Sequence, residues 1–434
     1  MLRFFLAILI LLAPVISPAS DLSHAGSDNL QSGKLRWNKN SFRIAISQSL
    51  IAPSSNIKIN SDVNGAIEES LRAWENAANI TFQRSFTDRL SASPSGPAGD
   101  GISLITIAQT PENVLMFDKG ISDASARTRV FIDRRGFVTE ADIVLNPFQQ
   151  FSTDGSLGTY DLQSALTHEV GHLLGLGHSP VLGATMFESL GKNGSYSMQS
   201  RFARTLSAED VAAVRALYGT SSSDCCGRIV GKITAPRASK DLQVWVENAD
   251  TAAVAAETDL APDGSFQVGG LSSGKYRVMI QNSTSAKFLT PASEVAVVDV
   301  GKDRTARVTE TIKPANVNMD FRYIGVGSQL GTVGAPLNAG RSYKFMVGGK
   351  TLPDKLQIGS DSPFIEVDTS GLSRDDYNDT TAAALFTVRV RPDARPGDYS
   401  LYLQGENGAK RYLIGAITVE TYEDPTSLFV GTPY

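Results

Sequence analysis

The sequence THEVGHLLGLGHS, from Thr167 to Ser179, places three histidines within eleven positions of a chain that has 4 His among its 434 residues. His168 and His172 are four residues apart, so on a helix both imidazoles project from one face about one turn apart. That separation suits two nitrogen ligands on one zinc ion, each about 2.0–2.1 Å from the metal. Glu169 is one step around the helix from His168, so it can reach a metal-bound water rather than the metal itself.

A glycine after this helix accounts for the third histidine. Gly175 stands where helical spacing would place the next residue of the same face, and glycine permits a positive φ. We therefore expect the chain to leave the helix at Gly175 and bend back, so that His178 completes a cradle of three nitrogens with one open position. Two other interpretations stay open: a structural zinc site, and a helix whose histidines merely pack or face solvent.

The motif and its flanks resemble the matrixin branch of the metzincin zinc endopeptidases. That group has the pattern HExxHxxGxxH followed by Ser, with a methionine turn beneath the metal, and here ATMF supplies Met186. Other segments fit matrixin landmarks in order, namely LRW near the start, the helix ending in Trp74, ADIVLNP at 141–147 and LSAEDVAAVRALYG at 206–219. The resemblance covers residues 35–220.

The resemblance implies an α+β catalytic domain, with a twisted mixed sheet, long helices and a short C-terminal helical subdomain. It also implies hydrolysis of peptide bonds in a protein or peptide substrate, with Glu169 as the general base and Met186 as a structural residue under the metal. The implied cofactor is one catalytic Zn²⁺ ion, with three ligands: His168, His172 and His178.

Some features depart from the family pattern. No His lies between His24 and His168, so we do not expect the second, structural zinc that many matrixins bind. No Cys precedes the motif, so the cysteine latency switch of the family is also missing, and TMFES lacks the proline and tyrosine that are common after the methionine. Calcium is frequent in the family. Asp133, Asp142 and Asp154 are candidate ligands, although solvated surface carboxylates are the favoured interpretation.

The N-terminus predicts export. Arg3 precedes an apolar run from Phe4 to Ala13, and small residues at 17 and 19 form a cleavage site, so residues 1–19 have the layout of a signal peptide. The alternative, a membrane anchor, would need about 20 apolar residues. We expect residues 20–34 to be a flexible leader and the mature chain to be secreted, without a membrane span.

The second half of the chain predicts two all-β domains. From Arg228 onward short alternating strands such as RIVGKIT and LQVWVEN fall between turn signals, a spacing that favours β-sandwiches. The order APDGSFQV, then GLSSGKYRVMI, resembles the carboxypeptidase regulatory-like (transthyretin-like) domains over residues 228–303. PGDYSLYL resembles bacterial immunoglobulin-like modules, which places a second β domain at 315–422. The fold class is therefore an α+β domain followed by two sandwiches.

Two further features concern partners and cysteines. The formal net charge of −5 argues against a nucleic-acid surface, which would need clustered Lys and Arg. Cys225 and Cys226 are neighbours, and Cα atoms across a trans peptide lie about 3.8 Å apart, short of the usual disulfide range. We expect two thiols without a structural role; a redox device and an intermolecular link are the alternatives.

The sequence thus predicts a secreted zinc-dependent endopeptidase. Two alternatives come from other classes: a catalytically degenerate matrixin-like protein that acts as a secreted binding or adhesion module, and a zinc hydrolase directed at glycans or cell walls. For the β domains, binding of substrate or cell surface and a role as a passive spacer both stay open.

Overall fold

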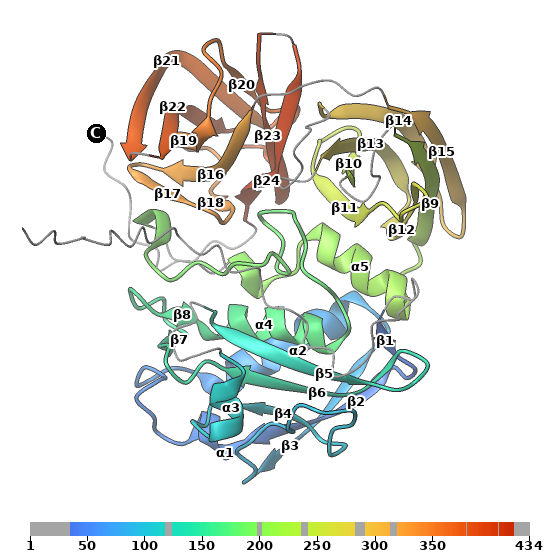
Figure 1. The fold of residues 1–434 in the computed structure, drawn as a ribbon, viewed down its shortest axis with the longest axis vertical. Coiled ribbons are helices and arrows are strands. Elements are labelled where there is room, and N and C mark those ends of the chain that lie inside the picture. The colour runs from blue at the N-terminus through green and yellow to red at the C-terminus, as the bar shows by residue number, and fades with distance from the viewer. Residues whose placement is uncertain are drawn as a thin grey trace, which may run out of the picture.

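The computed structural model describes residues 35–117, 124–197, 202–235, 242–282, 291–312, 319–378, 380–406 and 408–420. The signal peptide and leader predicted for residues 1–34 lie outside the described residues. Figure 1 shows an α/β domain at the bottom and two β domains side by side above it. The predicted order, an α+β domain followed by all-β domains, is confirmed.

The first domain is built on a mixed sheet with the strand order β1-β6-β4-β2-β3. Neighbours along this path run parallel, whereas β5 pairs antiparallel with β6. The strands are β1 (Arg36–Trp37), β2 (Ser41–Ser47), β3 (Thr81–Thr87), β4 (Ser103–Thr106), β5 (Ala126–Ile132) and β6 (Phe137–Leu145), and a separate short pair joins β7 (Phe151–Ser152) to β8 (Tyr160–Asp161).

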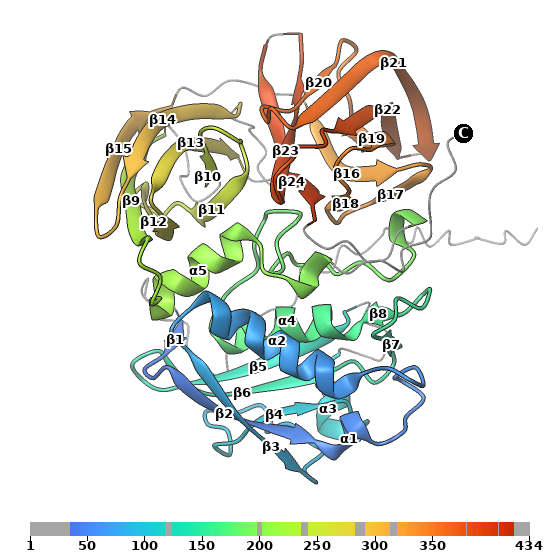
Figure 2. The same cartoon turned by 180° about the vertical axis from the view of Figure 1, so that it is seen from behind.

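Two long helices lie on one face of this sheet, between the sheet and the β domains, as Figures 1 and 2 show from opposite sides. Asp62 caps the start of helix α2 (Val63–Ala77), because its carboxylate accepts a hydrogen bond of 2.9 Å from the Gly65 N–H. Helix α4 (Leu162–Leu173) carries the histidine motif. The apolar faces of both helices pack on the sheet and form the core of this domain. Short helices α1 (Gln48–Ile51) and α3 (Pro111–Leu115) complete it.

Helix α5 (Ala208–Tyr218) ends the first domain. Ser207 and Asp210 form the capping box, and Gly219 ends the helix with a φ of +72°. Single turns η2 (Ser195–Ser197) and η3 (Phe202–Arg204) precede it. None of the described helices is long and apolar enough to cross a membrane.

The first β domain, defined here as β9 to β15, pairs a sheet β11-β10-β13-β14 with a sheet β12-β9-β15 around one core. Its strands are β9 (Cys225–Thr234), β10 (Leu242–Asn248), β11 (Val254–Asp259), β12 (Ser265–Ser272), β13 (Gly274–Asn282), β14 (Ser293–Val300) and β15 (Thr305–Thr311).

The second β domain, defined here as β16 to β24, pairs a sheet β17-β16-β19-β22-β21 with a sheet β18-β24-β23-β20. Its strands are β16 (Asp320–Val326), β17 (Gln329–Gly331), β18 (Ala335–Leu337), β19 (Ser342–Thr351), β20 (Gln357–Gly359), β21 (Ile365–Asn378), β22 (Thr381–Val390), β23 (Gly397–Gln404) and β24 (Lys410–Val419). The boundaries predicted for the two β domains, and their resemblance to named domain types, stay predictions.

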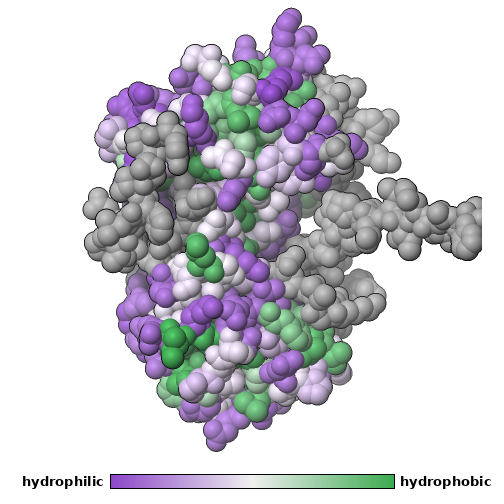
Figure 3. All heavy atoms as spheres, turned by 90° about the vertical axis from the view of Figure 1, so that its left-hand side faces the viewer, coloured by the Kyte–Doolittle hydropathy of each residue, from purple (hydrophilic) through white to green (hydrophobic). Residues whose placement is uncertain are grey.

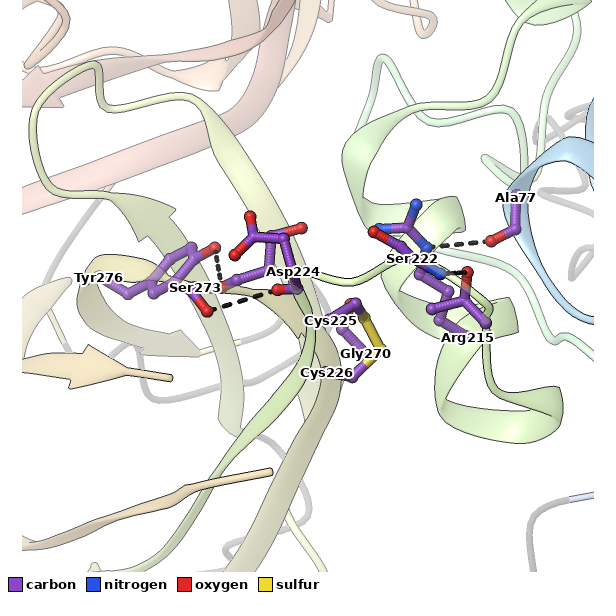
Figure 4. The surroundings of a disulfide bond; sticks show 11 residues. Ala77, Arg215, Ser222, Asp224, Cys225, Cys226, Gly270, Ser273 and Tyr276 are labelled. Carbon is purple, nitrogen blue, oxygen red and sulfur yellow. Dashed lines mark hydrogen bonds between the residues drawn. A yellow bond between two sulfur atoms is a disulfide. The ribbon is translucent and has the colours of Figure 1, made fainter. Parts of the chain in front are cut away.

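The two cysteines lie where the first domain passes into the first β domain (Figure 4). The expectation of two separate thiols is wrong: a disulfide joins Cys225 to Cys226, whose Cα atoms are 3.0 Å apart across a cis peptide. The expectation assumed a trans peptide, which would hold the Cα atoms farther apart.

Candidate metal centre

Helix α4 and the turn that follows it bring the three histidines together. His168 and His172 project from one face of α4, and Gly175 has a φ of +97°, so the predicted bend is confirmed. A Cβ on residue 175 would also lie 2.3 Å from the carbonyl oxygen of Leu35, which leaves no room for a side chain. His172 Nε2 then lies 3.0 Å from His168 Nε2 and 3.2 Å from His178 Nε2.

The remaining ring nitrogens of two histidines are fixed by backbone carbonyls. His168 Nδ1 lies 2.7 Å from Thr185 O, and His172 Nδ1 lies 2.9 Å from Leu176 O. Carbonyl oxygens only accept, so both Nδ1 atoms carry the hydrogen and each Nε2 presents its lone pair to the shared space. Such partners are the usual second contacts of metal-binding histidines.

The electrostatics of the cluster favour neutral rings. Burial lowers the pKa of His168, although its hydrogen bond to Thr185 acts in the opposite direction. Burial, followed by the neighbouring imidazoles, holds the pKa of His172 well below its usual range. Burial and the proximity of His168 lower the pKa of His178 to about 4. Neutral imidazole is the form that binds a metal ion.

This donor set fits a zinc ion. Two nitrogens bound tetrahedrally to one zinc at about 2.0–2.1 Å would lie about 3.3 Å apart, close to the separations between the Nε2 atoms. Among the described residues, these three histidines are the group of potential ligands that converges closely enough to hold a metal ion. Their roles as ligands stay a prediction.

Glu169 is buried beside the histidines and held from strand β5. Its Oε2 accepts a hydrogen bond of 2.5 Å from the hydroxyl of Thr128, and the side chain is 3% exposed. Burial raises the pKa of Glu169 to about 7, whereas the Thr128 hydroxyl and the charge of Arg127 both lower it. Thr128 belongs to the site, yet nothing in the sequence marks it, because the contact joins residues 41 positions apart.

Aromatic side chains from distant segments fix the position of α4. Trp74 Nε1 donates to Thr167 O at 2.9 Å, Trp37 Nε1 donates to Leu173 O at 2.7 Å, and the Tyr218 hydroxyl donates to Leu174 O at 2.5 Å. The last two bonds satisfy carbonyls at the C-terminal end of the helix, which have no partner within it. At the other end, Asp161 caps the helix and forms a partly buried ion pair with Arg204.

Met186 packs against Gly171 of the motif, and its role as a structural residue beneath a metal ion stays a prediction. It is 2% exposed, and a Cβ on Gly171 would lie 2.2 Å from its sulfur, so the glycine in the motif makes room for it. The turn around Met186 is held by Asp210, whose carboxylate accepts hydrogen bonds from the N–H groups of Thr185 (2.8 Å) and Met186 (3.1 Å). Asp210 also caps helix α5, and nothing in the sequence marks its contact with the methionine turn, because about 25 residues separate the two.

The candidate calcium ligands do not gather at one place. Asp133 and Asp154 accept hydrogen bonds from their own turns, at Phe137 N and Ser156 N. Asp142 is fully buried, so its interpretation as a solvated surface carboxylate is wrong. It accepts hydrogen bonds from the N–H groups of Ser93 and Leu104, which makes it a structural acceptor under the loop 93–104.

Comparison with known proteins agrees with the motif. Residues 36–219 match the matrixin family model (Peptidase_M10). Metalloendoproteinase 1-MMP of Arabidopsis thaliana is 28% identical over 192 residues, which cover 43% of this chain and 45% of that protein. Metalloendoproteinase 4-MMP of the same plant is 41% identical over 71 residues, which cover 16% of this chain and 19% of that protein. The chain therefore spans less than half the length of these curated relatives.

Similarity to solved structures adds nothing on fold. BcpA, the major pilin subunit of Bacillus cereus, is 12% identical, with 43% of this chain and 66% of that chain covered and a TM-score of 0.17, which is too low to support an argument. The sequence-based resemblance is the informative finding, because it places the motif, its methionine and the flanking landmarks in one family model. Residues 36–219 of this chain form a matrixin domain.

Proposed function

We propose that this chain is a secreted zinc-dependent endopeptidase that cleaves protein or peptide substrates. The observation that carries the proposal is the convergence of three Nε2 atoms, each on a ring poised to be neutral, beside a buried carboxylate. The matrixin match supports the same class of chemistry, and the sequence of residues 1–19 supports export.

His168, His172 and His178 would hold the zinc ion. When bound, zinc lowers the pKa of its coordinated water from 15.7 to about 7 and polarises the carbonyl of the bond to be cleaved. A site held by these three histidines, with no fourth protein ligand in the converging group among the described residues, would be of the catalytic rather than the structural kind.

Glu169 would act as the general base. A carboxylate with a pKa near neutrality can take a proton from the attacking water and then pass it to the amine of the leaving product. The Thr128 hydroxyl holds Oε2, so it orients the carboxylate and leaves the second oxygen for the water. Burial of Glu169 also keeps bulk water from competing for this proton.

Strand β5 is the proposed platform for the substrate. Among the described strands it pairs with β6 alone, so its outer backbone edge can add an extended peptide as a further strand. Because Thr128 belongs to β5 and contacts Glu169, a peptide on this edge would pass beside the proposed base.

The test is the variant Glu169→Gln in the full chain. We expect it to keep one zinc per chain and to lose nearly all cleavage of denatured casein, because the amide cannot accept the proton. Glu310→Gln, an exposed position on β15, is the matched control and should cleave like the parent protein. Cleavage by Glu169→Gln at the parent rate would show that the assignment is wrong.

The same assay separates the proposal from a catalytically degenerate binding module. An endopeptidase is inhibited by a zinc chelator and recovers when zinc is restored. A parent protein that binds zinc but cleaves neither casein nor gelatin would favour the binding module.

A further inference from the structure

The segment that follows the third histidine, residues 179–196, is covered by both β domains. Val181 and Ala184 are buried in a cluster with Trp245 and Met279 of the first β domain and with Ile414 of the second. Leu182 and Tyr196 are buried in the main core of the second β domain. Residues of the matrixin domain thus form part of the cores of its neighbours. We call this segment the junction loop.

Backbone hydrogen bonds fix the junction loop to the second β domain. Leu182 N donates to Ile414 O of β24 at 2.9 Å, and Gly334 N donates to Leu182 O at 3.0 Å. The backbone N–H and C=O of Leu182 are therefore both hydrogen-bonded to the second β domain. Farther along the loop, the Tyr196 hydroxyl donates to Val333 O at 2.8 Å.

Ion pairs and hydrogen bonds also join the two β domains to each other, which fixes both of them around the junction loop. Arg277 of the first pairs with Glu247 of its own domain and, at 3.8 Å, with Asp361 of the second. Within the second β domain, the Tyr412 hydroxyl donates to Asp361 at 2.6 Å and so fixes the carboxylate that faces Arg277. The backbone of Tyr412 exchanges two hydrogen bonds with the Gln281 side chain, at 3.0 and 3.2 Å. Below the β domains, the first domain contacts them across the middle of one face of the molecule (Figure 3).

The junction loop leads directly to a proposed zinc ligand. Thr185, three residues after Leu182, is the residue whose carbonyl fixes Nδ1 of His168. Its N–H is held by Asp210 at the start of α5. Helix α5 in turn packs on the first β domain, where Ala212 belongs to the core and a Cβ on Gly270 would lie 2.0 Å from Ala212 O. The second β domain therefore contacts the chain next to Thr185 through Leu182, and the first β domain is connected to Thr185 through helix α5 and Asp210.

We propose that the two β domains act as a positioning element for the metal centre: they hold the junction loop so that the Thr185 carbonyl keeps His168 oriented for zinc. Leu182 and Gly334 are the positioning residues at the contact. This inference rests on the proposed zinc-dependent function. It replaces the passive-spacer interpretation with one in which the β domains are needed for tight zinc binding.

A wedge at Gly334 tests the proposal in the full chain. A Cβ on residue 334 would lie 2.8 Å from Leu182 O and 3.0 Å from Leu182 C, so Gly334→Ala and the larger Gly334→Val push the loop away from β24. The matched controls are Gly371→Ala and Gly371→Val in the same β domain, where a Cβ meets nothing within 4 Å. The readouts are zinc affinity, by competition with a chromophoric chelator, kcat and KM on one peptide, and circular dichroism.

We expect zinc affinity to fall about 10- to 100-fold in the Gly334 variants, the usual effect of losing a contact behind a metal ligand, and to fall more for Val than for Ala. The Gly371 variants should match the parent protein. If Gly334→Val does not fold, the smaller Gly334→Ala decides. Equal zinc affinity in folded Gly334 and Gly371 variants, with the parent active, overturns the positioning role alone. A parent protein that binds no zinc overturns the proposed function as well.

Discussion

A buried carboxyl group at the junction of the domains contributes to the dependence of the chain's stability on pH. Asp398 of β23 is 3% exposed, and its Oδ1 accepts a hydrogen bond of 2.7 Å from the Thr418 hydroxyl. A Cβ on Gly183 of the junction loop would lie 2.1 Å from the same oxygen, so the docked loop is what seals this carboxyl group from water. The perturbation is Asp398→Asn, which keeps the shape and removes the titrating group.

Burial, with a further contribution from the charge of Asp210, raises the pKa of Asp398 to about 7 from its ordinary 3.8, although the Thr418 hydroxyl acts in the opposite direction. Between these two values the folded chain holds a proton that the unfolded chain has released. Stability is therefore greatest below about pH 4 with respect to this group and is lost as the pH rises to about 7. At 1.36 kcal/mol for each pKa unit, a shift of about 3 units amounts to roughly 4 kcal/mol at most.

The assay is thermal unfolding of the parent protein and of Asp398→Asn between pH 4.5 and 8, with the exposed Asp250→Asn as the control. Burial also raises the pKa values of Glu209 and Asp210, so the parent melting temperature should fall with rising pH for more than one reason. The difference between parent and variant isolates Asp398. At pH 8 it should reach on the order of 10 °C in favour of Asp398→Asn, and it should shrink toward pH 4.5. Parallel curves for the two proteins would refute the reasoning.

Three further substitutions test the metal centre. Thr128→Val removes the hydroxyl that orients Glu169. Because a hydrogen bond to a charged group contributes about 1.5–3 kcal/mol, we expect kcat/KM to fall about 10- to 100-fold while the zinc content stays unchanged. Unaltered kinetics would exclude this role for Thr128. His178→Ala should weaken zinc binding markedly, measured by metal analysis after dialysis, and full zinc retention would show that His178 is not a ligand. Gly171→Val should place a side chain against Met186 and Trp74. We expect this to lower the free energy of unfolding by about 1–3 kcal/mol and therefore to lower the melting temperature. An unchanged melting temperature would mean that the contact between residue 171 and Met186 is not tight.

Features of the fold that depend on neighbouring residues were predictable from the sequence. The cap at Asp62, the capping box at Ser207 and the bend at Gly175 each follow from side-chain or backbone preferences within a few positions. The projection of His168 and His172 from one helix face is likewise predictable, because it follows from their spacing of four residues. The mixed sheet of the first domain is a different case, because that expectation rests on the family resemblance rather than on any local pattern, and the strand order itself comes from the structure.

Contacts between distant segments could not be predicted in this way. Asp142 reads as one more acidic residue near a turn, and only the fold places it under the backbone of residues 93–104. Thr128 becomes part of the site because β5 runs beside α4. The disulfide between Cys225 and Cys226 is not predictable from the two residue types, because they do not specify the geometry of the peptide bond that joins them. In each case the deciding fact is a geometry that neighbouring residue types do not specify.

The apolar stretch VLGA, residues 181–184, shows how such long-range facts bear on function. Within a domain ending near residue 220 these side chains have no evident reason to be apolar, since they follow the third histidine of the motif in a turn. Their neighbours are Trp245, Met279 and Ile414, which lie more than 60 residues later in the chain. Residues 181–184 are held by apolar contacts with the β domains, so they lose these contacts when the β domains move away. Any force or partner that separates the β domains from the matrixin domain would therefore act on the carbonyl that orients His168.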